Sequence, residues 1–512
     1  MRYLVTGKEM KLLDKNTSDC FKVPELVLME QAALGFVQEL LSLLQQNNKK
    51  ASECSCLVFC GTGNNGADGI AIARLLNERG INTYICKCQE LYHLDANTSE
   101  SYDVQNRIYT EYQYPVITTS EELDTLDVDI VIDAVFGVGL SRMLSEAYMD
   151  IINTINRQKG IKIAVDIPSG IHSDNGQIMG ACVDCDYTYT FSFEKLGMYL
   201  WPGNAHVGAV RIIPIGITKR SWLTKKPSMA TLEMSDLLSL PIREDHSNKG
   251  TFGRLLIIAG SKDMAGAAIL SAKAAYRCGV GLVRIFTPEE NRMIVQTAIP
   301  EAVLSTYNNK VDKESLVDCL KWADAVLIGP GLSTSKTAKE LVEIVRSTAA
   351  VPVVWDADAL NIIAENSNSF LLPHTESIIT PHLGEFSRLI NNSVSWIQNH
   401  LVESAVEYAR TYDVICVLKD YHTVIANPYG LGFLNLSGNN GMATAGSGDV
   451  LAGMIASLLA QGIKAIDAAS FGVFLHGLAG DEAKTYYGEH GMIASDIVDG
   501  LVKVWNKLEN RQ

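Results

Sequence analysis

A chain of 512 residues exceeds what one hydrophobic core usually supports, so its length predicts more than one domain. The hydrophobic content of 47% excludes an intrinsically disordered chain. A formal net charge of −15 argues against a nucleic-acid partner, because nucleic-acid binders gather Lys and Arg on a basic face. Small anionic ligands remain compatible with this charge, since helix N-termini and backbone amides can hold them.

The first residues, 1–16, carry charges every few positions and lack the apolar core of a signal peptide. No stretch approaches the roughly 18 uninterrupted apolar residues that a membrane span needs. Among the 11 cysteines, only Cys182 and Cys185 have C-x-x-C spacing, and no second such pair completes a zinc site. Cys86 and Cys88 alternate along an expected strand, as buried thiols do. We therefore expect a soluble cytoplasmic protein with reduced structural thiols and no membrane partner.

Short apolar runs alternate with helical patterns in the first part of the chain. The expected strands are LVFC (57–60), INTYICK (81–87), DIVIDAV (129–135) and IKIAVDI (161–167). This alternation is typical of a parallel sheet covered by helices, here a doubly wound Rossmann-like α/β domain. Segment 8–46 has helical periodicity and is expected to pack beside the sheet without carrying chemistry.

A basic and polar stretch at 216–248 interrupts the pattern, and a second α/β alternation follows it. We place the boundary near Leu223, which gives domains 1–223 and 224–512. The expected strands of the second domain are LLIIAG (255–260), GLVRIFT (281–287), DAVLIGPG (324–331), VPVVWDAD (351–358), SIITPH (377–382) and VICVLKD (414–420). The sequence thus predicts two α/β domains.

The glycine-rich segment GTGNNGADG (61–69) directly follows the first of these strands. Glycines in such a turn let a phosphate approach the amides at a helix N-terminus. A glycine-rich turn without any ligand is an equally simple interpretation of the glycines. Asn64, Asn65 and Asp68, however, supply more polar groups than a turn requires.

Polar residues also follow two other strands: Asp133, before the loop Gly137-Val138-Gly139, and Asp166, before Ser169. Either aspartate alone could cap a helix. Ligands of doubly wound sheets bind outside the carboxyl ends of the strands, so the joint placement favours a shared site. The oxygen-rich set of Asn65, Asp133 and Ser169 suits a hard cation. His172 is interpreted as a loop residue.

The segments GTGNNGADG, DAVFGVG and DIPSG resemble the NAD(P)H-hydrate epimerase domain, also called the YjeF N-terminal domain, over about residues 1–220. Ala67 replaces a glycine of the usual motif, which adds only a methyl group. The resemblance implies that Asn65, Asp133 and Ser169 bind K⁺ and that Asp166 is the catalytic acid or base. Lys195 matches a lysine of the family, although a surface ion pair explains it equally well. The implied contacts to the hydrated cofactor are Asn64, Asn65, Gly66, Ala67, Asp68, Gly137, Val138, Gly139, Leu140, Ser141, Arg142, Met143 and Asp166.

The segment NNGMATAGSGD (439–449) precedes a strongly apolar helical run. The turn Gly446-Ser447-Gly448 directs backbone amides at an anion, at the positive end of the following helix. Asp449 can then take the proton of a hydroxyl that attacks a phosphoryl group, while the amides stabilise the transferred charge. Asp is also favoured in a first helical turn by the helix dipole alone, but that does not explain the glycines.

This turn resembles the anion hole of the ribokinase-like superfamily. The further segments KGTFG (249–253), GPGL (329–332), WDADAL (355–360), TPHLGE (380–385) and LKDYHTVIA (418–426) resemble ADP- or ATP-dependent NAD(P)H-hydrate dehydratase over about residues 225–512. The resemblance implies a ribokinase-like fold and Asp449 as catalytic base. The implied contacts to the hydrated cofactor are Ala268, Gly331, His382 and Asp449, and those to the nucleotide are Lys419, Asp420, Tyr421, His422, Thr423 and Gly448.

Several of these roles have alternatives. His382 could be a hydrogen-bonded histidine at a strand end, and Asp356 and Asp358 could cap a helix or organise Mg²⁺ through water. Asp420 stands where the family has glycine, and its carboxylate would repel a phosphate unless it turns away.

Together the two resemblances imply repair of hydrated NADH and NADPH, by epimerisation of the R and S hydrates and nucleotide-dependent dehydration of the S hydrate. The fused arrangement favours ADP over ATP, with Mg²⁺, and the family implies a homo-oligomer. The alternative is a small-molecule kinase for a vitamin alcohol with a non-catalytic N-terminal ligand-binding module. That alternative does not explain TPHLGE, KGTFG or the epimerase-like segments.

Overall fold

The computed structural model describes residues 1–509 except 95, 242, 244, 309 and 366–374. The chain divides into two compact units, one of Tyr3–Met229 and one of Met1–Arg2 with Ala230–Gln512. The boundary expected at Leu223 lies shortly before this division. The first two residues belong to the C-terminal unit, which no local sequence pattern indicated.

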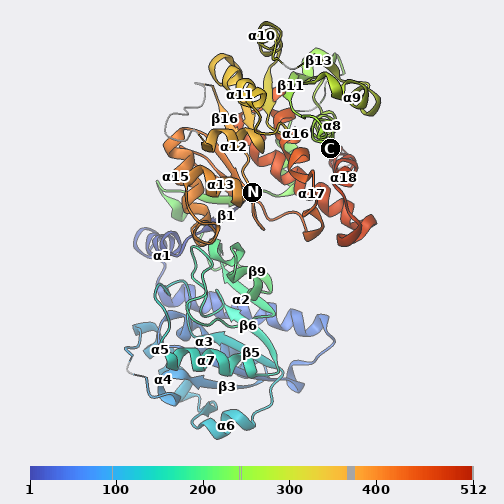
Figure 1. The fold of residues 1–512 in the computed structure, drawn as a ribbon. Coiled ribbons are helices and arrows are strands. Elements are labelled where there is room, and N and C mark those ends of the chain that lie inside the picture. The colour runs from blue at the N-terminus through green and yellow to red at the C-terminus, as the bar shows by residue number, and fades with distance from the viewer. Residues whose placement is uncertain (95, 242, 244, 309, 366–374, 510–512) are drawn as a thin grey trace. The chain divides into compact units, whose positions relative to one another are not determined.

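The N-terminal unit is built on a seven-stranded sheet in the order β4-β3-β2-β5-β6-β7-β9 (Figure 1). Every neighbouring pair in it is parallel. The chain winds outward from β2 in one direction and then from β5 in the other, so the predicted doubly wound topology is confirmed. Its strands are β2 (Ser55–Cys60), β3 (Asn82–Lys87), β4 (Val116–Ile117), β5 (Ile130–Ala134), β6 (Ile161–Val165), β7 (Tyr187–Phe191) and β9 (Ala209–Ile213).

Helices cover both faces of this sheet because successive side chains of a strand point to opposite sides. Val58 and Cys60 of β2 face Gly69 of α3, whereas Leu57 and Phe59 belong to the core cluster on the α7 side. The helices of the unit are α1 (Gly7–Phe21), α2 (Glu25–Gln46), α3 (Asn64–Glu78), α4 (Cys88–Leu91), α5 (Glu100–Glu111), α6 (Ser120–Thr125) and α7 (Glu146–Arg157).

Helix α2 is the one described helix that is long and apolar enough to cross a membrane by length and composition, with a window hydropathy of 1.4. Its apolar residues have partners inside the unit. Phe36 packs edge-on against Tyr189 of β7 at 4.9 Å between ring centroids, and Leu40 and Leu44 are buried beside it. The expectation that segment 8–46 packs beside the sheet is confirmed.

A short parallel pair ties the start of the chain to the segment that follows β7. Strand β1 (Arg2–Val5) pairs with β8 (Glu194–Lys195), with Val5 opposite Lys195. Helix α1 begins directly after β1, with a capping box in which Thr6 accepts from Glu9 N and Glu9 accepts from Thr6 N. This pairing fixes α1 next to the residues that follow β7.

The C-terminal unit is built on a sheet in the order β13-β12-β11-β14-β15-β16-β17-β18-β19, with β10 beside β19. The seven strands β11 to β17 run parallel to one another. Strands β18 and β19 each pair antiparallel with the strand before them. All six strands expected for this domain are present. The bounds are β10 (Met229–Thr231), β11 (Arg254–Ile258), β12 (Leu282–Pro288), β13 (Val303–Tyr307), β14 (Ala325–Ile328), β15 (Val353–Trp355), β16 (Ser377–Ile379), β17 (Ile415–Leu418), β18 (Val424–Ala426) and β19 (Gly432–Leu434).

Helix α16 packs closely on α8 in the core of this unit. At Gly453 a side-chain carbon would lie 2.2 Å from the Ser271 carbonyl oxygen, so the two helices meet backbone to backbone. The helices are α8 (Ala265–Arg277), α9 (Arg292–Ala298), α10 (Lys313–Trp322), α11 (Lys336–Thr348), α12 (Asp358–Glu365), α13 (Leu383–Ile390), α14 (Val394–Asn399), α15 (Leu401–Tyr412), α16 (Ser447–Ala460), α17 (Ala465–Gly491) and α18 (Ala494–Glu509).

All 11 cysteines carry free thiols, and every one except Cys20 is buried. Cys86 lies on β3, but the expected strand ends before Cys88, which is the first residue of α4. The expectation of an alternating strand through Cys88 is therefore wrong, although both thiols are buried.

Candidate functional site

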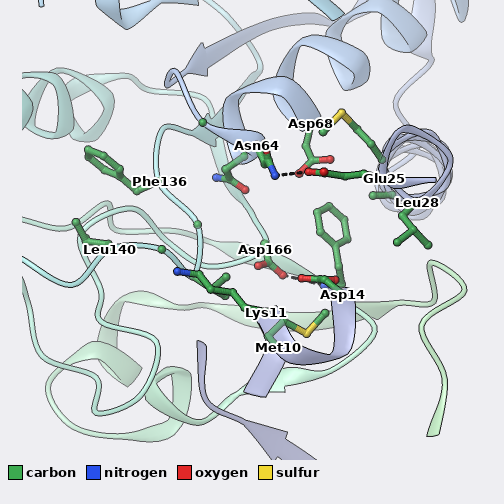
Figure 2. A pocket seen from close by; sticks show the side chains of 18 of the residues that line it. Met10, Lys11, Asp14, Glu25, Leu28, Asn64, Asp68, Phe136, Leu140 and Asp166 are labelled. Carbon is green, nitrogen blue, oxygen red and sulfur yellow. Dashed lines mark hydrogen bonds between the residues drawn. The ribbon is translucent and has the colours of Figure 1, made fainter. Parts of the chain in front are cut away.

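A cavity of about 970 Å³ lies in the N-terminal unit, at the carboxyl ends of β2, β5 and β6 (Figure 2). This is the reversal point of the strand order, where doubly wound sheets bind ligands. Most residues predicted to contact the hydrated cofactor line it: Asn64, Asn65, Asp68, Gly137, Val138, Gly139, Leu140, Ser141, Arg142 and Asp166.

Three predicted contact residues lie outside this lining. At Gly66 a side-chain carbon would lie 1.8 Å from the Gly61 carbonyl oxygen, so only glycine fits the turn there. Ala67 is fully buried as the fourth residue of α3, which accommodates the extra methyl group inside the fold. Met143 is 65% exposed beyond the glycine loop. Contacts of these three with a ligand stay predictions.

Helices α1 and α2 form the opposite wall of the cavity and bring charged groups into it, among them Lys11, Asp14 and Glu25. Segment 8–46, in which the sequence shows no obvious chemistry, therefore contributes charged side chains to the cavity. The sequence did hold one signal: Asp14 follows Met10 by four residues and shares the helix face on which Met10, Leu13 and Thr17 are buried. Glu25 also accepts a hydrogen bond from the Asn64 side chain of the glycine-rich turn.

Asp166 sits at the floor of this cavity with a backbone φ of +70°, in the left-handed region that costs energy for any residue except glycine. Its Oδ1 accepts from Phe191 N at 3.0 Å and from Thr190 Oγ1 at 3.2 Å. Lys195 forms an ion pair with Asp166 and donates to Thr190 Oγ1 at 2.8 Å. The Lys195 side chain is 0% exposed, so the alternative of a surface ion pair is wrong.

Burial shifts the acidity of the other carboxyl groups in the cavity. The pKa of Asp14 is raised to about 7, first by burial and then by the negative charge of Asp166. Burial raises the pKa of Asp68 well above its usual range, with further contributions from Asp166 and Asp14. The cavity thus combines two carboxyl groups with raised pKa values and an aspartate that forms an ion pair with the buried Lys195.

The three predicted cation ligands lie together behind the glycine loop. Ser169 donates from its backbone N to Asp133 Oδ2 at 2.7 Å and from Oγ to Asp133 Oδ1 at 2.6 Å. Asn65 lies against Gly137 in the same region, and its Nδ2 is buried without a partner among the described residues. Burial raises the pKa of Asp133 to about 6. One buried carboxylate with hydroxyl and amide neighbours fits a weakly charged hard cation better than a multivalent metal cluster.

In the C-terminal unit, the glycine turn predicted to hold an anion lies at the N-terminus of α16. Gly446 caps the helix with a φ of +89°, which requires glycine, and Asp449 lies in its first turn. The Lys419 ammonium lies against the turn, since a side-chain carbon at Gly448 would be 3.4 Å from Lys419 Nζ. A phosphoryl group here would meet helix amides and an ammonium together.

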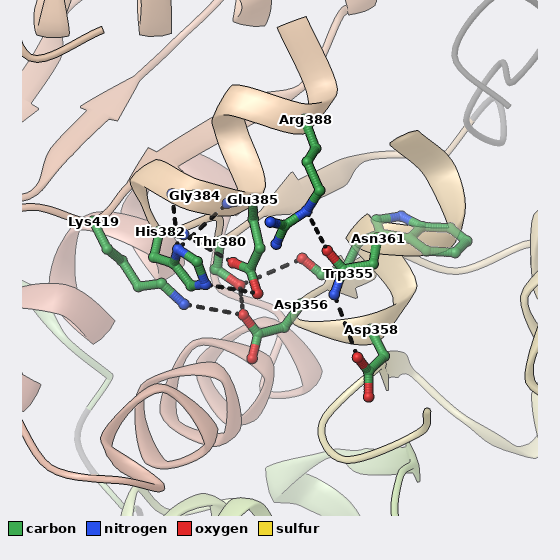
Figure 3. A network of polar contacts seen from close by, with 10 residues as sticks. All are labelled: Trp355, Asp356, Asp358, Asn361, Thr380, His382, Gly384, Glu385, Arg388 and Lys419. Carbon is green, nitrogen blue, oxygen red and sulfur yellow. Dashed lines mark hydrogen bonds and ion pairs between the residues drawn. The ribbon is translucent and has the colours of Figure 1, made fainter. Parts of the chain in front are cut away.

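Lys419 belongs to a polar network at the ends of β15, β16 and β17 (Figure 3). Asp356 Oδ1 accepts from Lys419 Nζ at 3.2 Å and from Thr380 Oγ1 at 2.7 Å, with only 2% of the Asp356 side chain exposed. Asp358 instead accepts from Ser333 N at 2.7 Å and anchors the loop after Gly331. The two aspartates therefore position neighbouring groups, which goes beyond simple helix capping.

His382 is the N-cap of α13. Its Nδ1 accepts from Gly384 N at 2.9 Å and from Glu385 N at 3.3 Å, as the strand-end alternative predicted. Because Nδ1 is an acceptor, the neutral ring carries its proton on Nε2. Burial and the charge of Lys419 lower the pKa of His382. The side chain remains 56% exposed, and its Nε2 lies 3.5 Å from Glu385 Oε1.

The charges in this network tune Asp449. Its pKa is raised to about 7, mainly by burial and the charge of Asp356, while Lys419 lowers it. For Lys419, burial works to lower the pKa, but Asp356 and Glu385 outweigh it and the pKa is raised. Glu385, 6% exposed within the TPHLGE segment, is a contributor that the sequence analysis did not single out.

A second cavity, of about 440 Å³, adjoins this turn. All residues predicted to contact the nucleotide line it: Lys419, Asp420, Tyr421, His422, Thr423 and Gly448. His476 of α17 also lines it, 3.4 Å from Ser447 Oγ, and burial lowers its pKa to about 4. No local motif marks this histidine, because α17 brings it to the site from 27 residues beyond Asp449.

The remaining two predicted residues, Ala268 and Gly331, lie near one another at the start of α8. Gly331 has a φ of +57°, and a side-chain carbon there would be 2.9 Å from Ala267. Ala268 is fully buried. A contact between Ala268 and a ligand stays a prediction.

Comparison with known proteins matches both halves of the chain. The family model described as NAD(P)H-hydrate dehydratase matches residues 255–503, and the model described as the YjeF-related protein N-terminus matches residues 25–197. A bifunctional NAD(P)H-hydrate repair enzyme of Moorella thermoacetica is 36% identical over 99% of this chain and 97% of that protein. The chain belongs to this family.

Other members of the bifunctional NAD(P)H-hydrate repair enzyme family agree with the assignment. The enzyme of that name from Escherichia coli K12 is 35% identical over 88% of this chain and 85% of its own length. The C-terminal unit also has the predicted ribokinase-like fold. A ribokinase-like superfamily protein from Enterococcus faecalis is 29% identical, covers 55% of this chain and 96% of its own, and gives a TM-score of 0.50.

Proposed function

We propose that this protein restores hydrated NADH and NADPH, with an epimerase in the N-terminal unit and a nucleotide-dependent dehydratase in the C-terminal unit. The carrying observation is the coexistence of two chemically different sites in a chain of this family. One is a cavity with several acidic side chains around Asp166, and the other is a glycine anion hole with Asp449 beside Lys419. A vitamin kinase with an inert N-terminal module would not need the buried Asp166–Lys195 pair.

In the dehydratase, the hydroxyl group of the hydrated ring would have to leave as hydroxide, which is a poor leaving group. Phosphorylation of this hydroxyl lets it leave as phosphate, which is a good leaving group. Asp449 takes the proton of the ring hydroxyl as its oxygen attacks the terminal phosphoryl group of the nucleotide. The amides of 446–448 and Lys419 hold the transferred charge. The electron pair of the ring nitrogen then expels phosphate, and loss of a ring proton restores the dihydronicotinamide.

The nucleotide binds in the cavity lined by Lys419 through Thr423, and we favour ADP as the donor. Mg²⁺ supplies charge neutralisation on the phosphates. Asp356 and Asp358 would reach it through water, as Mg²⁺ usually keeps several water ligands. One oxygen of each carboxylate already accepts hydrogen bonds, from Thr380 and Lys419 at Asp356 and from Ser333 at Asp358. Asp420 lines the same cavity, and burial raises the pKa of its carboxyl group.

In the epimerase we propose that Asn65, Asp133 and Ser169 hold K⁺. The support is the buried Asp133 carboxylate together with the neighbouring Ser169 hydroxyl and the Asn65 side chain, whose amide oxygen could serve as a ligand. K⁺ would orient the glycine loop through these ligands. Replacing Na⁺ by K⁺ is expected to raise the unfolding temperature of the wild-type protein and to leave that of Asp133→Asn unchanged. Equal responses of the two proteins would contradict the site.

One assay separates the two activities. The protein is given a mixture of both hydrate epimers with ADP or ATP and Mg²⁺, and the absorbance of the dihydronicotinamide is followed. Complete recovery supports both activities. Recovery that stalls after the S epimer is consumed contradicts the epimerase, and no nucleotide-dependent recovery contradicts the dehydratase. We also propose a cytoplasmic homo-oligomer acting on small molecules without nucleic acid, to be checked by light scattering and cell fractionation.

A further inference from the structure

Asp14 is a charged group in the N-terminal cavity to which the proposed reaction assigns no role. It projects from α1, whereas Asp166 follows β6, and Figure 2 shows both side chains directed into the same space. Helix α1 is fixed there by the pairing of β1 with β8, the strand that carries Lys195. The two carboxyl groups thus reach the cavity from different elements that one strand pair holds together.

The surroundings of the two carboxyl groups differ. Asp166 forms an ion pair with Lys195, whose side chain is fully buried. The structure shows no ion pair to Asp14 among the described residues. Burial and the charge of Asp166 raise the pKa of Asp14 to about 7, although Lys195 acts to lower it. The other charged groups that line the cavity are Lys11, Lys15 and Asp19 on α1, Glu25 on α2, Asp68 on α3 and Arg142 after β5.

We propose that Asp14 is a second catalytic residue of the epimerase, which works with Asp166 as an acid and base pair that serves the two faces of the hydrated ring. This inference rests on the proposed epimerase function. Inversion at a carbon that carries a hydroxyl needs an acid for the departing oxygen and a base for the oxygen that enters on the other face. Asp14 protonated and Asp166 ionised provide such a pair.

The hydrate carries its hydroxyl on a ring carbon bonded to the ring nitrogen. Protonated Asp14 gives its proton to this hydroxyl, the C–O bond breaks with its electron pair leaving on water, and the nitrogen lone pair forms a C=N bond. A water molecule then adds to the opposite face, the C=N electrons return to nitrogen, and Asp166 takes the surplus proton. One proton has moved from Asp14 to Asp166. Exchange with solvent water, which takes the proton from Asp166 and supplies one to Asp14, restores the starting state before the next turnover.

The test uses the full-length protein with the R hydrate as the sole substrate, and the nucleotide-dependent step reports each S hydrate formed. Wild-type protein must convert the R hydrate faster than spontaneous epimerisation. If it does not, the proposed epimerase function fails, whatever the role of Asp14. The reaction of pure S hydrate in the same protein measures the dehydratase alone.

With a functioning wild-type epimerase, Asp14→Asn is expected to lower the kcat of inversion at least about 100-fold with little change in KM. The rate on S hydrate should stay unchanged. The matched control is Asp103→Asn, which removes an exposed carboxylate from α5 of the same unit and should change neither rate. A kcat of Asp14→Asn equal to that of wild type, or a loss confined to KM, overturns the proposal.

Two further measurements exclude a purely structural effect. Asp14→Glu keeps the acid and should recover part of the inversion rate with a displaced pH profile; a folded Asp14→Glu with the wild-type profile overturns the assignment, even if Asp14→Asn fails to fold. In water enriched in ¹⁸O, each inversion should place one solvent oxygen in the hydroxyl. Inversion with retention of the original oxygen overturns the proposed step.

Discussion

Asp449 illustrates how a single side chain acquires its role from position. In the first turn of α16 the helix amides favour a negative charge, yet burial and Asp356 raise the pKa of Asp449 to about 7. Lys419 opposes this shift from the other side of the glycine turn. The result is a carboxyl group that is more basic than an ordinary aspartate and therefore better able to accept a proton.

Replacing this base should abolish dehydration. In Asp449→Asn we expect the rate on S hydrate to fall by about 10²- to 10⁴-fold, because the amide cannot take the hydroxyl proton. Interconversion of the epimers, followed by chromatography, should continue at the wild-type rate. Loss of both activities in a folded variant would contradict independent sites.

The pKa of Asp449 also predicts the pH dependence of dehydration. The base must be ionised, so the rate should fall as the pH drops below about 7 and reach roughly a tenth of its plateau near pH 6. Because Lys419 lowers the pKa of Asp449, Lys419→Gln should move the midpoint of the profile to higher pH. A midpoint that stays in place or moves to lower pH would show that another group controls the rate.

At the scale of elements, the contact between α8 and α16 holds the dehydratase site together. Gly453 of α16 lies against the Ser271 carbonyl of α8, and Ser271 in turn donates from Oγ to the Asp449 carbonyl oxygen at 3.0 Å. The contact therefore connects the position of α8 directly to the turn of the helix that carries the base.

Gly453→Ala should separate these two helices. A methyl group 2.2 Å from a carbonyl oxygen cannot be accommodated, so we expect a loss of about 1–3 kcal/mol in unfolding free energy by denaturant titration. Gly266→Ala is the matched control within α8, where a side-chain carbon meets nothing within 4 Å. It should be neutral or stabilise the helix by up to about 1 kcal/mol. Equal effects of the two variants would contradict the close packing.

At the scale of the whole molecule, the chain consists of two units with separate cavities. A ligand that binds one folded unit should stabilise that unit by mass action and leave the other unchanged. We expect ADP with Mg²⁺ to slow amide hydrogen exchange in 419–423 and 446–450. Exchange in 61–69 and 137–143 should not change. Slower exchange in 61–69 or 137–143 at a lower ADP concentration than in 419–423 would show that the nucleotide binds the N-terminal unit, which would contradict the prediction.

Much of this organisation was predictable from the sequence because its signals are local. Apolar runs between glycine-rich turns identified the ten expected strands, and the ends of parallel strands meet at one sheet edge, which brought Asp133 and Asp166 into one region. The glycine turn before Asp449 likewise predicted an anion site, since its conformation depends on adjacent residues. Periodicity also placed α1 and α2 correctly as helices.

Only the tertiary structure decided which distant groups share a cavity. Asp14 lines the epimerase cavity because β1 pairs with β8, a contact between residues about 190 positions apart. Lys195 is buried against Asp166 for the same reason, and His476 reaches the nucleotide cavity through the packing of α17. Sequence periodicity indicates which face of a helix or strand is buried, but it does not indicate which other element packs against that face. The sequence by itself therefore determined the types of the site residues and the turns that carry them. The neighbouring charges that set the pKa values of these residues were decided only by the tertiary structure.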